Sequence, residues 1–250
     1  MVSVIRIGCA GWALGKRSQS RFSPTGSYLE RYASVLNAVE INSSFYRAHL
    51  TKTYQRWAAS VSEDFRFSVK VPREITHRQR LRESGPLLER FLGEVQGLGN
   101  RLGPLLVQLP PSLEFSPHLV ATFLEEVRGR FSGAVVCEPR HESWFGPAAN
   151  SMLAALEIAR VAADPAIVPD AAAPGGWGGL VYYRLHGSPK MYHSSYSDEY
   201  LRSLASTLTT TAQADAYCVF DNTASEEAMT NALLLRELVR AEGPVELPAP

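Results

Sequence analysis

The chain has 250 residues, of which 45% are hydrophobic, and its 25 Lys and Arg residues balance 25 Asp and Glu residues. A formal net charge of zero provides no global field that would draw the protein to nucleic acid or to an anionic membrane. No stretch approaches the roughly 20 apolar residues of a membrane span, and the N-terminus lacks a signal-peptide pattern. We therefore expect a soluble, cytoplasmic protein with no membrane partner.

Three cysteines, Cys9, Cys137 and Cys218, lie far apart in the chain and lack the spacing of metal ligands. Each lies in an apolar run, where a thiol behaves as a small hydrophobic group. We interpret them as buried structural thiols, which is consistent with a reducing compartment.

Eight short runs rich in Val, Ile, Leu, Phe and Tyr recur at intervals of about 20 to 40 residues, the repeat of a strand–helix unit. They cover residues 2–8, 38–42, 66–72, 105–110, 134–140, 158–164, 180–187 and 216–222. Apolar residues at helical spacing fill most of the gaps, including 28–36 and 87–95, and a last helix is expected over 224–241. The runs are almost continuously apolar, which indicates strands buried on both faces in a parallel sheet.

These units predict one domain over residues 1–250, a (β/α)₈ TIM-type barrel. Eight units close into a barrel, whereas five or six would form an open doubly wound sheet, and no GxGxxG motif follows the first run. One crossover departs from the pattern. Residues 169–179 include Ala-Pro-Gly-Gly-Trp-Gly-Gly, which is too rich in glycine for a helix, so we expect an irregular crossover after the sixth strand.

Polar side chains end most of the eight runs, where an apolar core would not place them. They are Glu40 and Asn42, Lys70, Gln108, Glu138, Arg140 and His141, Asp164, Arg184 and His186, and Asp221 and Asn222. Because alternate residues of a strand share a face, Glu138 is expected beside Arg140. The same rule pairs Arg184 with His186. In a barrel these pairs converge at the carboxyl ends of the strands, where barrel enzymes hold their active sites; an internal salt-bridge network is the structural alternative.

Several ordered motifs carry a family resemblance. They are Ile7-Gly8-Cys9-Ala10-Gly11-Trp12, Val39-Glu40-Ile41-Asn42-Ser43-Ser44-Phe45-Tyr46-Arg47, Phe67-Ser68-Val69-Lys70-Val71-Pro72 with Ile75-Thr76-His77, residues 102–112 and 138–144, Tyr183-Arg184-Leu185-His186-Gly187, and Phe220-Asp221-Asn222-Thr223. In these motifs the sequence resembles the YecE-like family, domain of unknown function 72, along nearly the whole chain. The resemblance implies a TIM-type barrel and no established reaction. The chain departs from the family pattern at Cys9-Ala10, where Thr-Ser is usual, at Pro139, where Phe is usual, and at Asp221, where Asn is usual; the first departure removes two hydroxyl groups from the predicted site.

The favoured hypothesis is an enzyme that binds a small anionic substrate, bearing phosphate or carboxylate. Lys70, Arg140 and Arg184 are predicted to hold the anion, because guanidinium groups bind such groups through two parallel hydrogen bonds. The predicted catalytic residues are Glu40, Glu138, Asp164 and His186, since burial can raise a carboxyl pKa towards neutrality and histidine titrates near pH 7. The other predicted substrate-binding residues are His141, Asn42, Gln108, Asn222, Trp12, His77 and Tyr192.

Two alternatives concern the chemistry of the same residues. Glu40, Glu138, Asp164 and His186 could form a divalent-metal site, but the interleaved cations would repel a metal, so we expect no resident metal and at most a transient Mg²⁺ or Mn²⁺. Lys70 could instead form a Schiff base with a carbonyl substrate.

A further alternative is a nucleic-acid-binding or endonuclease-like barrel. Three loops expected at the rim combine basic and aromatic residues: Trp12, Lys16, Arg17, Arg21 and Phe22; Arg73, His77, Arg78, Arg80 and Arg82; and Lys190, Tyr192, His193, Tyr196 and Tyr200. Basic groups interleaved with aromatic rings can bind a phosphate backbone and stack bases. A solvated charged surface explains the same loops, and the neutral net charge does not favour nucleic acid.

Overall fold

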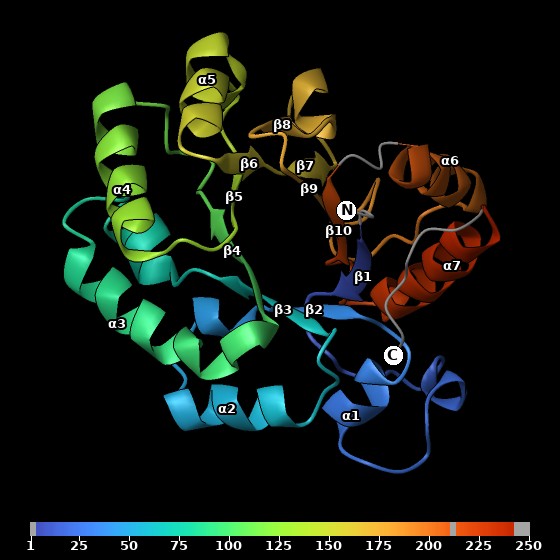
Figure 1. Ribbon diagram of the computed structural model, residues 1–250. Helices are drawn as coiled ribbons and strands as arrows, with labels where there is room; N and C mark the ends of the chain where they lie inside the picture. Colours follow the sequence, from blue (N-terminus) through green and yellow to red (C-terminus); the bar gives the residue numbers. More distant parts are fainter. Residues whose placement is uncertain (1–3, 211–213, 243–250) are drawn as a thin grey trace.

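The computed structural model describes residues 4–210 and 214–242. Ten strands occur in this part of the chain: β1 (Ile5–Cys9), β2 (Ala38–Ile41), β3 (Arg66–Lys70), β4 (Leu102–Gln108), β5 (Val135–Glu138), β6 (Ile158–Arg160), β7 (Ala162–Asp164), β8 (Gly175–Gly176), β9 (Leu180–Leu185) and β10 (Asp215–Phe220). The α-helices are α1 (Tyr28–Ala33), α2 (Thr51–Ala59), α3 (Gly85–Val95), α4 (Pro117–Arg130), α5 (Pro147–Ala155), α6 (Asp198–Thr210) and α7 (Glu227–Ala241). The helices surround the strands (Figure 1).

Local sequence signals set where several helices begin. Helix α1 starts with a capping box, in which the Ser27 hydroxyl accepts from the Glu30 backbone N–H and the Glu30 carboxylate accepts from the Ser27 backbone N–H. These bonds satisfy donors that the first helical turn leaves free. Helices α3, α4 and α5 each carry proline in their first turn, where the missing N–H costs no hydrogen bond.

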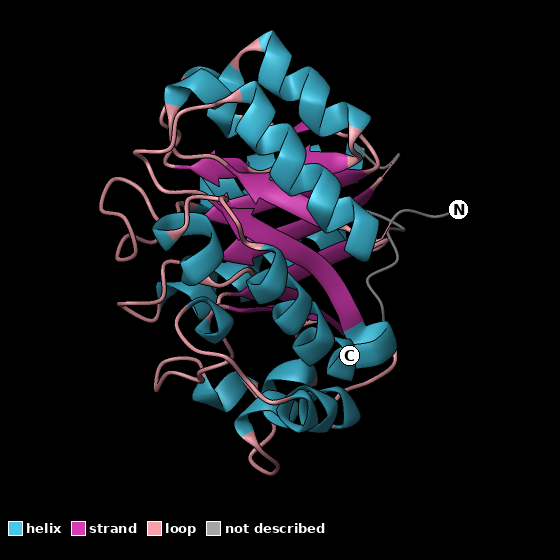
Figure 2. Cartoon of the chain, turned by 90° about the vertical axis from the view of Figure 1, so that its left-hand side faces the viewer, coloured by secondary structure: helices cyan, strands magenta, loops and turns pink. Residues whose placement is uncertain are grey.

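The strands pair in two sheets, in the order β1-β10-β9-β7 and β2-β3-β4-β5-β6-β8. Every pairing is parallel except that of β8 with β6. The strands form the inner layer of the molecule, and the longest loops project from one end of them (Figure 2). The α/β class with parallel sheets is therefore as predicted, and so is the irregular sixth crossover: residues 165–179 contain β8 and a short 3₁₀ turn, Pro169–Ala172, with no α-helix.

The hydrogen bonds between strands do not form the predicted single ladder of eight strands; they form two separate sheets. The expected sixth strand is divided at Val161, whose N–H donates to the Cys137 carbonyl at 2.9 Å. Before this residue the chain follows β5, and after it Ala162–Asp164 pairs with β9 in the other sheet. On the opposite side, the two sheets meet through one parallel bridge between Ala10 and Glu40. A strand that changes partners midway explains why one predicted run becomes two short strands.

Two apolar clusters enclose the strands from both sides. The larger packs the strands against the helices, with Phe67, Phe91 and Phe123 buried in it. The smaller is built from strand residues and those beside them, and it includes Leu106, Val136 and Tyr182. Burial on both faces is what the continuously apolar runs predicted.

Two further expectations concern the chain as a whole. The three cysteines are buried and unpaired, as predicted. Among the helices of residues 4–210 and 214–242, none combines the length and the apolar character needed to span a membrane.

Candidate functional site

Arg184, near the end of β9, is fully buried and contacts three carboxylates. Its Nε and Nη2 donate to the two oxygens of Glu40 at 2.8 and 2.6 Å, which makes a bidentate pair. Its Nη1 donates to Glu138 Oε2 at 2.8 Å, and its Nη2 lies 3.2 Å from Asp221 Oδ2. Burial alone would lower the pKa of Arg184, but the three carboxylates raise it well above its ordinary value. The guanidinium therefore stays charged at the centre of the site.

The parallel topology explains why these groups meet. Glu40 lies in β2, Glu138 ends β5 and Asp221 directly follows β10. Because the carboxyl ends of parallel strands lie at one edge of a sheet, residues distant in sequence converge there. We call the set Glu40, Glu138, Arg140, Arg184, His186 and Asp221 the charged cluster.

His186 bridges two carboxylates of the charged cluster. Its Nδ1 lies 3.0 Å from Asp221 Oδ2, and its Nε2 lies 2.9 Å from Glu138 Oε1. Nε2 also lies 2.7 Å from Nη2 of Arg140. An imidazolium donates to both carboxylates, whereas the neutral ring protonated at Nδ1 accepts from Arg140. When Nδ1 carries a proton, Asp221 accepts from it in both forms, and the two forms differ only in the proton at Nε2.

Cations dominate the titration of the two acids beside His186. Burial alone would raise the pKa of Glu138, but Arg184, Arg140 and His186 together hold it well below its ordinary value. Burial would also raise the pKa of Asp221, but Arg184 and His186 outweigh burial, so the pKa of Asp221 lies below its ordinary value. The expectation that burial raises the pKa of Glu138 towards neutrality is therefore wrong, because three cationic or hydrogen-bonding neighbours outweigh burial. Glu138 remains an anion and is a poor proton acceptor at neutral pH.

Tyr182 connects the cluster to the apolar interior of the strands. Its hydroxyl lies 3.2 Å from Glu40 Oε2 and 2.9 Å from the Ser68 hydroxyl, while its ring stacks on Tyr217. Ser68 in turn donates to the Pro104 carbonyl at 3.0 Å. Buried polar groups are costly unless each finds a partner. These hydrogen bonds fix the position of the Glu40 carboxylate relative to β3, β4 and β9, and Glu40 in turn fixes the position of Arg184.

Lys70, the last residue of β3, is only 5% exposed. Its Nζ lies 4.2 Å from the centre of the Phe45 ring. Within residues 4–210 and 214–242, its ammonium makes no hydrogen bond and has no carboxylate within 4.0 Å. Burial and the nearby Arg184 lower the pKa of Lys70 to about 8, against the attraction of Glu40 and other acids. The group is thus a cation near neutral pH whose hydrogen-bonding capacity is unused.

Arg140 occupies the edge of the cluster and retains donors. Its Nη2 contacts Glu138 Oε1 at 2.5 Å, and its side chain is 10% exposed. Its buried Nε has no hydrogen-bond partner among the described residues. An unpaired buried N–H is costly, so one edge of this guanidinium is available to an acceptor that the protein itself does not supply.

Two other predicted residues lie close to the cluster. The Tyr192 ring meets His186 edge-on, with centroids 5.8 Å apart, and covers it from the solvent side with 41% of its own surface exposed. Its backbone is held by hydrogen bonds from Tyr192 N–H to the His186 carbonyl and from the Ala224 N–H to the Tyr192 carbonyl. Gln108 ends β4, half-buried, opposite Glu138 in the register.

The remaining predicted residues have other contacts. His77 packs edge-on against Phe45 with centroids 4.9 Å apart, and the same Phe45 ring contacts the Lys70 ammonium. The Asp164 carboxylate accepts from the Tyr196 hydroxyl at 2.9 Å, and its backbone carbonyl accepts from the His186 N–H at 2.7 Å. Among the described residues, the carboxylate itself forms no hydrogen bond or ion pair with the charged cluster. The His141 side chain caps a 3₁₀ turn, Glu142–Phe145, by accepting from the Ser143 N–H.

Three more predicted residues, Asn222, Trp12 and Asn42, lie outside the charged cluster. Asn222 donates to the Ser194 carbonyl and to Asn231, which places it in loop packing. Trp12 and Asn42 line a separate cleft. Both follow the ends of strands, where the alternation of strand side chains no longer sets direction.

Sequence reasoning did not select Asp221, Tyr182 or Ser68 as site residues. Asp221 ends the last predicted run and differs from the residue usual in the resembled family, so two signals pointed to it. Ser68 and Tyr182 lie on the same strand faces as Lys70 and Arg184, two residues earlier in each case, and the alternation rule could have identified them.

The carboxylates of the cluster form ion pairs with Arg140 or Arg184, and the imidazole of His186 contacts Arg140. Across residues 4–210 and 214–242, no group of three or more His, Cys, Asp or Glu side chains is arranged to hold a metal ion. The predicted Mg²⁺ or Mn²⁺ alternative therefore has no preformed ligand set in this part of the chain.

Comparison with known proteins places this geometry in a family. The family model described as "Protein of unknown function DUF72" matches residues 6–250. The chain belongs to the DUF72 family. A DUF72 protein from Enterococcus faecalis V583 has 20% sequence identity and a TM-score of 0.78, covering 98% of this chain and 100% of that one. A DUF72 protein from Thermotoga maritima has 22% identity and a TM-score of 0.77, covering 95% and 99%. At these identities the likeness shows the fold alone.

Curated DUF72-like relatives match over shorter segments. The UPF0759 protein YecE of Escherichia coli K12 is 34% identical over 120 residues, which is 47% of this chain and 43% of the E. coli protein. The UPF0759 protein YunF of Bacillus subtilis is 26% identical over 152 residues, or 58% of this chain and 53% of that protein. The chain thus matches about half the length of each of these relatives.

Proposed function

We propose that the two sheets act as one (β/α)₈ barrel and that this protein is an enzyme acting on a small anionic substrate held between Lys70 and Arg140. The observation that carries the proposal is the pair of unused donors: a nearly buried ammonium without a counterion and a guanidinium whose buried Nε has no partner. Arg184 is not part of this clamp, because its three nitrogen atoms are already bonded to carboxylates.

The unpaired positive charge of the site supports an anionic ligand. The cluster with Lys70 contains three carboxylates (Glu40, Glu138 and Asp221), two guanidinium groups and one ammonium, a formal sum of zero. The carboxylates are all bonded to Arg184 or Arg140, however, and among the described residues none lies within 4.0 Å of the Lys70 ammonium. Guanidinium and ammonium groups are the usual donors to phosphate and carboxylate groups.

Each residue then has a defined task. Lys70 and the free edge of Arg140 bind the anionic group, and Gln108, between their strands, offers an amide to a neutral part of the substrate. His186 transfers a proton at Nε2, with Asp221 orienting the ring through Nδ1. Arg184 holds the three carboxylates in place and does not touch substrate. The Tyr192 ring packed against His186, which is itself fully buried, limits access of water to the imidazole.

The test is a calorimetric titration of inorganic phosphate and of pyruvate, one probe for each anionic group, at low ionic strength. We expect wild-type protein to bind at least one of them and Arg140→Met to weaken that binding at least tenfold while circular dichroism stays unchanged. Arg202→Met is the matched control, because Arg202 is an exposed arginine on α6. Binding that is identical in the wild type and in the Arg140→Met variant would reject the clamp.

A further inference from the structure

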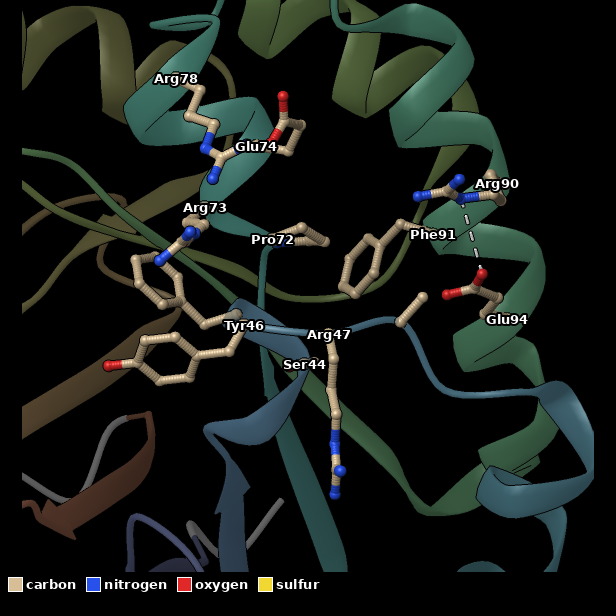
Figure 3. Close-up of a pocket in the computed structure, with 12 residues that line it drawn as sticks. Ser44, Tyr46, Arg47, Pro72, Arg73, Glu74, Arg78, Arg90, Phe91 and Glu94 are labelled. Carbon is tan, nitrogen blue, oxygen red and sulfur yellow. Dashed lines mark ion pairs between the residues drawn. The ribbon is translucent and has the colours of Figure 1, made fainter.

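A cavity of about 330 Å³ is lined by four arginines (Figure 3), and Phe45, whose ring contacts the Lys70 ammonium, also lines it. We call it the arginine pocket; Arg47, Arg73, Arg78 and Arg90 line it together with Glu74 and Glu94. Four positive and two negative side chains give the lining a formal charge of +2. In a chain of zero net charge this is a local concentration of positive charge, and it lies outside the charged cluster.

Within the described part of the chain, one arginine of this pocket has no side-chain partner, and two others form only exposed ion pairs. Arg73 is half-buried and, among the described residues, forms no hydrogen bond or ion pair through its side chain. Arg78 pairs with Glu74 at 3.1 Å and Arg90 with Glu94 at 3.6 Å, and both guanidinium groups are largely exposed. Arg78 and Arg90 approach from opposite sides of Pro72 and Phe91 (Figure 3). Exposed ion pairs contribute little to stability, so an entering phosphate can replace them.

A second cavity, of about 710 Å³, lies next to the arginine pocket and is rich in aromatic rings. We call it the aromatic cleft; Trp12, Tyr28, Tyr46, His49 and Trp57 line it. Trp12 and Trp57 meet edge-on with centroids 5.1 Å apart, while Tyr28 and Tyr46 are 57% and 64% exposed. Rings that remain this accessible in a concave surface are suited to stacking on a planar ligand.

The cleft also offers a hydrogen-bond acceptor. Asn42 lines it, and the side-chain oxygen of Asn42 is buried without a hydrogen-bond partner in the described residues. A ring N–H or an exocyclic amino group is the complement of such an oxygen. The cleft therefore combines stacking surface with one polar contact, as binding sites for heterocycles do.

Two residues line both cavities. Tyr46 and Arg47 belong to the arginine pocket and to the aromatic cleft, and both are exposed, so they form a low wall between the two. The Arg47 guanidinium points away from those of Arg73 and Arg78 (Figure 3). A ligand that extends over Tyr46 and Arg47 can place a planar ring in the aromatic cleft and a phosphate in the arginine pocket.

We propose that the arginine pocket and the aromatic cleft together bind one nucleotide, with its phosphate among Arg73, Arg78 and Arg90 and its base against Trp12 and Trp57. This site is separate from the charged cluster and does not depend on the function proposed for it. The residues that line the two cavities come from the loops after β1, β2 and β3 and from α1, α2 and α3. Two of the three loops are among those whose mixture of basic and aromatic residues the sequence singled out.

The test compares three probes by calorimetry at constant ionic strength: AMP, adenosine and ribose 5-phosphate. We expect AMP to bind at least tenfold more tightly than either fragment, because only AMP fills both cavities. The double variant Arg73→Ala/Arg78→Ala is expected to weaken AMP binding at least tenfold and to leave adenosine binding unchanged. Trp12→Ala is expected to weaken AMP and adenosine and to leave ribose 5-phosphate unchanged.

Two control variants separate this site from other effects. Arg202→Ala removes an exposed arginine that pairs with Asp198 four residues away, as Arg78 pairs with Glu74, and AMP binding should not change. Arg140→Met disables the charged cluster and should also leave AMP binding intact. AMP that binds no more tightly than ribose 5-phosphate, that fails to bind at millimolar concentration, or that is lost in Arg140→Met but kept in Arg73→Ala/Arg78→Ala would overturn the proposal.

Discussion

Arg184 and Glu40 form a bidentate ion pair in which neither side chain has any exposure to solvent. A buried pair of this kind need not add stability, because taking two charges out of water offsets their attraction. Its effect here is to fix geometry. Arg184 holds Glu40 with two nitrogen atoms and still reaches Glu138 and Asp221, so one guanidinium sets the position of every carboxylate beside His186.

Arg184→Met is predicted to lower the free energy of unfolding by about 3–5 kcal/mol, because it leaves buried carboxylates without their shared cation. Urea denaturation followed by circular dichroism measures the change. Arg202→Met, at an exposed position, serves as the control and should alter stability by less than about 0.5 kcal/mol. A loss below about 1 kcal/mol in Arg184→Met would mean that the carboxylates do not depend on this residue.

Glu138→Gln is predicted to flatten the dependence of stability on acid pH. A carboxyl whose pKa is lower in the folded than in the unfolded state stabilises the fold above its unfolded pKa, and this contribution disappears as pH falls through the folded pKa. Glu138 and Asp221 both have lowered pKa values, so the wild type should lose stability from near pH 4.5, the ordinary Glu value, downwards.

The measurement for Glu138→Gln is urea denaturation between pH 2.5 and 7, with Glu199→Gln as the control at an exposed position. We expect a smaller slope below pH 4.5 in Glu138→Gln, and a lower stability at pH 7 because Arg184 loses one charged partner. An unchanged slope would show that Glu138 titrates alike in both states.

Lys70 is predicted to make anion binding at the charged cluster pH-dependent. Because burial lowers the pKa of Lys70 to about 8, the folded protein loses this positive charge as pH rises through 8. Phosphate affinity should therefore fall between pH 7 and 9.5 in the wild type and fall much less in Lys70→Arg, whose guanidinium stays charged. Calorimetric titration across this range measures both. Parallel curves for the two proteins would remove Lys70 from the site.

Tyr192→Ala is predicted to expose His186 with little loss of stability, since Tyr192 is 41% exposed and covers the imidazole with one ring edge. The measurement is modification by diethyl pyrocarbonate, followed residue by residue by peptide mass spectrometry. We expect His186 to react slowly in the wild type and several-fold faster in Tyr192→Ala, with the rate at His118, which is exposed, as the internal control. Equal rates at His186 in the two proteins would show that another group covers it.

Much of the fold follows from the sequence because its signals are local. The continuous apolar run Ala134-Val135-Val136-Cys137 predicts a strand buried on both faces, and the glycine-rich segment before Leu180 predicts the crossover that lacks a helix. The division of the sixth strand at Val161 could not be predicted, because it depends on which neighbouring strands the chain meets on either side of that residue.

The site was predictable to the extent that alternation decides it. Glu138 contacts Arg140, and Arg184 and His186 both contact Glu138 and Asp221, as the spacing of each pair predicts. Spacing could not predict that all three guanidinium nitrogens of Arg184 bind carboxylates. Alternation gives the strand face on which a side chain lies, but not how many other side chains converge on that side chain. The positions of Trp12 and Asn42 in the aromatic cleft likewise depend on loop direction.

The proposed function is tested most directly by the location of a bound anion. The measurement is anomalous scattering from crystals soaked in selenate, whose position requires no prior assumption about the substrate. We predict selenate within hydrogen-bonding distance of Lys70 Nζ and of the free edge of Arg140, in addition to any bound in the arginine pocket. Selenate that occupies the arginine pocket or the surface while Lys70 and Arg140 remain without it would contradict the proposal.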